Sequence, residues 1–137
     1  MICRARLPVP LMLIAAFMIL GFAVLLGSAL AVLHLRTQAD ATWPVVPWPL
    51  GALHGLLGIG GLLCLVLALR GPPRGIAQGT ASFGAIAATL LALAALAGGA
   101  ILAAHLRRRR RAGALIGVHA ALAVSGFVIV AAYLLVG

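Results

Sequence analysis

Acidic residues are almost absent from this chain. Of its 137 residues only 1 is Asp or Glu, and charged residues of both signs make up 8%, whereas 65% of the chain is hydrophobic. A soluble domain carries about 25% charged residues, so this composition excludes a soluble globular protein. The single acid, Asp40, lies between apolar runs. The chain therefore also lacks the membrane-embedded carboxylate on which proton-coupled exporters usually rely.

Cysteine and catalytic motifs are also scarce. Cys3 stands near the start of the chain and Cys64 lies inside an apolar run, so we expect both to be unpaired and no disulfide framework to exist. The chain has no glycine fingerprint for nucleotide phosphates and no Ser, His and acid set for nucleophilic catalysis. These absences leave no sequence motif that would identify an enzyme.

Lysine is missing altogether. All 10 cationic residues are arginine, and the net charge is +9. Such a charge can indicate nucleic-acid binding. Here, however, the arginines lie only between long apolar runs, where membrane proteins carry orientation signals and contacts to anionic headgroups. We therefore expect a lipid bilayer as the partner of these charges and no nucleic acid.

Four apolar runs reach the length of about 20 residues that a membrane-spanning helix needs. They cover residues 10–35, 50–69, 81–106 and 113–136, and they predict a single all-α domain, residues 1–137, that crosses the cell inner (plasma) membrane several times. The first run follows Arg4 and Arg6 and could instead be a signal peptide. Its length exceeds the roughly 7–15 residues of a signal-peptide core, which favours a true span.

The links between the runs contain Pro and Gly. Residues 36–49 hold three prolines with Trp43 and Trp48, and residues 70–75 read Arg-Gly-Pro-Pro-Arg-Gly. Both links are predicted turns, and tryptophan suits the headgroup layer. Because short links make consecutive spans antiparallel neighbours, the sequence predicts an integral membrane four-helix bundle with up-down-up-down topology.

Arginines flank both ends of the predicted spans. Four arginines share one face with the termini, Arg4, Arg6, Arg70 and Arg74, whereas Arg36 and the five-arginine run 107–111 stand at the other. The face richer in arginine is expected in the cytoplasm, so we place both termini in the periplasm. The run could also bind anionic lipid or phosphate, but a topology signal is the plainer explanation.

Each predicted span contains one histidine. In an up-down-up-down bundle all four share one half of the molecule. His34 and His105 lie next to flanking arginines, whereas His54 and His119 lie roughly 8 Å inside their spans. An outer histidine needs no function beyond reaching the membrane surface. A deep one is costly and indicates a functional site, although a hydrogen bond to a neighbouring helix carbonyl would also explain it.

The two halves of the chain resemble each other. His34-Leu35-Arg36 closes the first run, and His105-Leu106-Arg107 closes the third. The deep histidines are each followed seven residues later by a glycine, Gly61 or Gly126. These matches indicate a weak duplication of a helical hairpin, in which His54 and His119 are equivalent.

The deep histidines are suited to axial ligation of a haem iron, which takes two neutral imidazoles on opposite sides of the porphyrin. Small residues share their helix faces and would leave room for the flat macrocycle: Gly51, Gly58 and Gly61 near His54, and Ala123 and Gly126 near His119. The propionates would meet cations and donors near the surface: Arg36, Arg107 with the rest of its run, His34 and His105.

The chain resembles the small four-helix bacterial membrane cytochromes b in its deep histidines, their small-residue faces and its basic loop. The resemblance is strongest from about Leu50 onward. The resemblance implies haem b, electron transfer and exchange with a quinone. Members of that group often carry two histidines on one helix for two stacked haems. No run here has two histidines, so we expect one haem.

Two alternatives remain open from the sequence. Glycines at four-residue spacing, such as Gly51 and Gly55 or Gly113 and Gly117, favour close helix packing. The chain could therefore be a non-catalytic small subunit or assembly factor that packs against a larger membrane complex, or a homo-oligomer. A four-histidine zinc or copper site at the mouth of the bundle is the other alternative, although the two depths fit one ion poorly.

Overall fold

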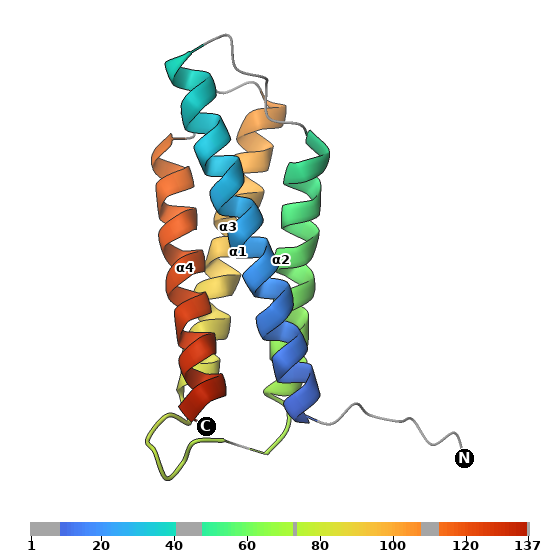
Figure 1. Cartoon of the computed structure of the whole chain (residues 1–137), viewed down its shortest axis with the longest axis vertical. Helices are drawn as coiled ribbons and strands as arrows, with labels where there is room; N and C mark the ends of the chain where they lie inside the picture. Colours follow the sequence, from blue (N-terminus) through green and yellow to red (C-terminus); the bar gives the residue numbers. More distant parts are fainter. Residues whose placement is uncertain (1–8, 41–47, 73, 108–112, 137) are drawn as a thin grey trace, which may run out of the picture.

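The structure, a computed structural model, describes residues 9–40, 48–72, 74–107 and 113–136. These residues form four helices: α1 Val9–Ala39, α2 Trp48–Ala68, α3 Phe83–Leu106 and α4 Gly113–Val136. All four are long and apolar enough to cross a membrane, which confirms the expectation of an all-helical chain with four such segments. The helices lie side by side, and the chain reverses its direction between consecutive helices (Figure 1).

Helix boundaries follow local chemistry. α1 continues past Arg36 because no Pro or Gly interrupts it there. The Thr37 hydroxyl donates to the Leu33 carbonyl at 2.8 Å, and the Asp40 N–H donates to the Arg36 carbonyl at 2.9 Å. α3 starts two residues later than expected, because Gly79 has a φ of +70° and turns the chain shortly before it.

The molecule is built from two helical hairpins. α1 packs most extensively on α2 and α3 on α4, and the hairpins then touch through α1 with α4 and α2 with α3. Each hairpin has a buried glycine at the close approach of its two helices. A Cβ at Gly61 would lie 2.7 Å from Leu20, and a Cβ at Gly126 would lie 2.8 Å from Leu91. Small residues of this kind let helix backbones come near each other.

These two contacts are equivalent under the internal repeat. The sequence offset between His34 and His105 also relates three pairs of residues that contact the partner helix of their hairpin in the same way. These pairs are Leu20 and Leu91, Ala23 and Ala94, and Gly27 and Gly98. The structure thus contains two copies of one hairpin packing pattern.

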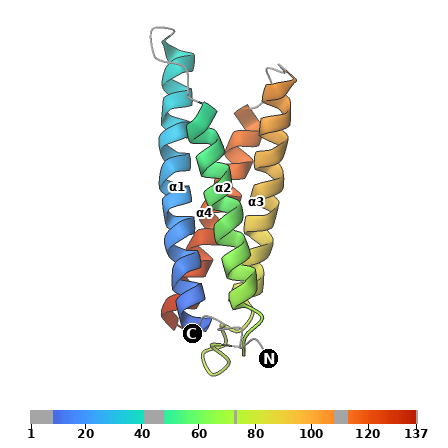
Figure 2. The same cartoon turned by 90° about the vertical axis from the view of Figure 1, so that its right-hand side faces the viewer.

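The buried core occupies the end of the bundle opposite the histidines. It draws on the first half of α1 and α3 and the second half of α2 and α4: Leu13, Ala16, Leu20, Leu65, Ala68, Ala87, Leu91, Val130 and Tyr133. At the other end α1 and α3 are further apart (Figure 2). There, a Cβ added at any of several glycines would meet no atom within 4 Å: Gly51, Gly55, Gly58, Gly99, Gly113 and Gly117.

Candidate functional site

All four histidines lie in the same half of the molecule. α1 and α3 end, and α2 and α4 begin, at the same end of the bundle (Figure 1). His34 and His105 occupy the last turns of α1 and α3, whereas His54 and His119 follow the first turns of α2 and α4. The placement expected from an even number of antiparallel helices is therefore found in the described residues.

The two deep histidines meet between the hairpins. The ring centroids of His54 and His119 lie 5.8 Å apart, and the ring planes are inclined by 80°. Both side chains are half-buried. Two imidazoles from different hairpins thus face each other in the half of the bundle that lacks a buried core.

Each deep imidazole is held by its own hairpin. His54 Nδ1 donates to the Ala23 carbonyl on α1 at 2.9 Å, and His119 Nδ1 donates to the Ala94 carbonyl on α3 at 2.7 Å. A carbonyl oxygen can only accept, so Nδ1 carries the proton and Nε2 of the neutral ring keeps a lone pair. Metal-binding histidines are commonly oriented by this kind of bond.

Two glycines make room for these rings. A Cβ at Gly27 would lie 2.6 Å from His54 Cε1, and a Cβ at Gly98 would lie 3.2 Å from His119 Cε1. Each imidazole therefore rests against the backbone of the neighbouring helix. The small-residue faces of the histidine-bearing helices do not point to Gly27 and Gly98, which lie on the other helix of each hairpin. The offset that relates His34 to His105 also aligns these two glycines and could have found them.

The small residues expected to line a macrocycle divide into two groups. Gly58 has open space beside it, and Ala123 is half-buried. Gly61 and Gly126, in contrast, are buried against leucine side chains of their own hairpins. This corrects the expectation for Gly61 and Gly126: the groove beside each of them is filled, because it serves the packing of α1 on α2 and of α3 on α4.

The outer polar residues lie further from the deep pair than the sequence suggested. His34 and His105 are eleven residues beyond the alanines that bind the deep imidazoles, which corresponds to roughly 16 Å along a helix at 1.5 Å per residue. The Gln38 side-chain amide donates to His34 Nε2 at 2.8 Å. His105, Arg36 and Arg107 are exposed. These residues form a polar rim around the mouth of the bundle.

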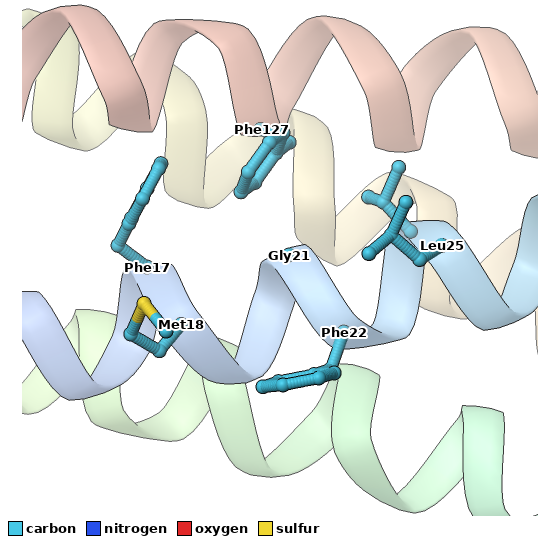
Figure 3. A pocket seen from close by; sticks show the side chains of 7 residues that line it. Phe17, Met18, Gly21, Phe22, Leu25 and Phe127 are labelled. Atoms are coloured by element: carbon cyan, nitrogen blue, oxygen red, sulfur yellow. The ribbon is translucent and has the colours of Figure 1, made fainter.

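Two clefts follow the contact between α1 and α4. One of about 310 Å³ is apolar and lies beside the stacked rings of Phe17 and Phe127, whose centroids are 5.1 Å apart (Figure 3). The other, of about 290 Å³, reaches the rim and is lined by His34, Gln38 and small residues of α4. Neither cleft is lined by His54 or His119.

A metal site built from protein side chains alone is not formed by the residues that the structure describes. Among them, no group of three or more His, Cys, Asp or Glu side chains could hold an ion. This corrects the four-histidine zinc or copper alternative, because only the two deep histidines come together. Zinc takes three or four protein ligands, whereas a porphyrin brings four nitrogens and leaves two positions for imidazoles.

Several residues singled out in the sequence lie outside the described residues: Cys3, Arg4, Arg6, Trp43 and residues 108–111 of the arginine run. The described part of the chain therefore contains Arg107 as the first member of that run. No family model, no curated protein and no solved structure matches this chain.

Proposed function

We propose that the protein is a b-type haem protein of the bacterial inner membrane that transfers electrons. In this proposal the four helices cross the bilayer as an up-down-up-down bundle with both termini in the periplasm, and one haem is ligated between α2 and α4 by His54 and His119. The observation that carries the proposal is the convergence of these two imidazoles, each with Nδ1 hydrogen-bonded to a backbone carbonyl of its own hairpin.

The spacing of the two rings suits a shared iron. The ring centroids lie 5.8 Å apart, so His54 and His119, one from each hairpin, would be near enough to hold the same haem iron.

The packing of the bundle also supports a bound group near these histidines. The buried core is confined to the opposite end, and Gly58, on the same helix as His54, has no neighbour within 4 Å of an added Cβ. A flat apolar macrocycle would contribute there the buried area that the side chains do not provide. The core end would keep the hairpins together in its absence.

The chain's own residues would orient the ligands and tune them. The carbonyls of Ala23 and Ala94 accept the Nδ1 protons, fix the tautomer of each imidazole and make it a stronger donor towards iron. Haem with two imidazole ligands supplies reversible one-electron oxidation and reduction when bound. Exposed cations at the rim, Arg36 and Arg107, would attract propionates, an anionic redox partner or lipid headgroups.

The same hydrogen bonds favour a second candidate function. Each bond satisfies a deep histidine inside its own hairpin, so the pair is also explained by helix packing alone. In that case the protein is a non-catalytic small subunit or assembly factor of a larger membrane complex. It would present lipid-compatible faces to its partner, and the imidazoles would bind no cofactor.

A haem titration separates the two candidates. The full chain is purified in mild detergent and haem is added in steps while the visible absorbance is recorded. We expect saturation at one haem per chain, and we expect His54→Ala and His119→Ala each to weaken binding by at least tenfold, because one axial ligand is lost. His34→Ala and His105→Ala serve as matched controls from the rim. A wild-type chain that takes up no haem would leave the packing subunit as the function.

A further inference from the structure

Gly27 and Gly98 contact the deep imidazoles more closely than any other glycines of the described residues do. We propose that they are the positioning residues of the histidine pair. The missing side chain at each position lets an imidazole lie against the neighbouring helix, donate its Nδ1 proton to a carbonyl and keep Nε2 free. The role in ligand binding rests on the proposed function, whereas the hydrogen bonds themselves do not require a bound group.

The contacts at Gly27 involve the whole ring. A Cβ there would lie 2.6 Å from Cε1, 3.1 Å from Nδ1 and 3.4 Å from Nε2 of His54. Carbon atoms pack at about 3.5–4.0 Å. The ring therefore occupies the volume that any other residue at this position would need, and its Nδ1 reaches the carbonyl of Ala23, one helical turn earlier.

The second copy of the arrangement is looser. A Cβ at Gly98 would lie 3.2 Å from Cε1 and 3.4 Å from Nδ1 of His119. An alanine there would require a shift of a few tenths of an ångström, whereas an alanine at Gly27 would require the His54 ring to move away. The geometry thus predicts two effects of the same kind but of different size.

The chain offers matched control positions. Gly60 lies on α2, the helix of His54, and Gly99 follows Gly98 on α3, yet an added Cβ at either would meet no packing neighbour within 4 Å. Gly60→Ala and Gly99→Ala therefore introduce the same methyl group into α2 and α3 without touching an imidazole. A general effect of removing glycine would appear in the controls as well.

The test measures the tautomer of each imidazole in the haem-free full chain. Histidine is labelled with ¹⁵N, the protein is held in detergent micelles, and nitrogen NMR distinguishes protonated from unprotonated ring nitrogens. We expect His54 and His119 to carry the proton on Nδ1 in the wild type. Gly27→Ala should remove the Nδ1–H signal of His54, and Gly98→Ala should shift the signal of His119 and keep its tautomer. The two control variants should leave both signals in place.

An unchanged Nδ1–H signal of His54 in Gly27→Ala would overturn the inference. If that variant does not fold, Gly98→Ala takes its place: a shifted His119 signal supports the inference, and an unchanged one overturns it. The haem titration on the wild-type chain tests the proposed function separately. Tautomers that respond in a chain that binds no haem would support the positioning role and reject the cofactor.

Discussion

His54 on α2 and His119 on α4 face each other with ring centroids 5.8 Å apart, although each ring is hydrogen-bonded to the other helix of its own hairpin. Each of the two similar hairpins thus contributes one imidazole to the contact between them. The internal repeat supplies one ligand candidate from each copy. In the proposed function these two imidazoles, one from each hairpin, would hold the haem.

The first prediction concerns the buried glycines of the two hairpins. Gly61→Ala and Gly126→Ala should each lower the free energy of unfolding by about 1–3 kcal/mol, because the added methyl overlaps the side chain of Leu20 or Leu91. Gly60→Ala is the control, since no atom lies within 4 Å of its added Cβ. Thermal unfolding in detergent measures the difference. Equal stability of Gly60→Ala and Gly61→Ala would contradict the close packing of α1 on α2.

The second prediction concerns the contact between hairpins. Phe17 and Phe127 stack at 5.1 Å across α1 and α4, whereas the repeat-equivalent positions on the other side hold Ala88 and Leu62. A double-mutant cycle with Phe17→Leu and Phe127→Leu should give a coupling free energy of about 0.5–1.5 kcal/mol. Additive effects in the cycle would mean that the rings do not stack in the membrane-embedded protein.

The third prediction concerns orientation in the membrane. Replacing the arginine run 107–111 with neutral residues should invert or scramble insertion, because these charges oppose Arg4 and Arg6 at the other face. A reporter enzyme that is active on only one side of the membrane, fused to the C-terminus, measures the outcome. An unchanged orientation would assign the run to lipid or partner binding instead.

The existence of four long helices followed from composition and from the length of the apolar runs, and one boundary difference has a clear cause. Sequence reasoning ended the first helix near Arg36, where polar residues begin. The structure continues it to Ala39 because no Pro or Gly interrupts the backbone bonds there, and the Asp40 N–H still donates to the Arg36 carbonyl. Polarity marks the edge of a membrane span, whereas a helix stops only where its backbone bonds are interrupted.

The histidine site was predicted in part. Its members and their equivalence came from residue spacing, but their hydrogen-bond acceptors are backbone carbonyls, which carry no residue-specific signal. Gly61 illustrates the other limit. Its place on the same helix face as His54 suggested a groove, and only the three-dimensional packing reveals that Leu20 fills the space. Periodicity gives the face of a helix but not the neighbour that covers it.

Axial ligation by the deep pair can be tested with a reduced-minus-oxidised visible spectrum of the purified protein. We predict sharp low-spin bands in the wild type, their loss in His54→Ala and in His119→Ala, and their partial return when free imidazole is added to either variant, because the small molecule can occupy the vacated ligand position. Bands that persist in both variants, or that disappear only in His34→Ala or His105→Ala, would contradict the account.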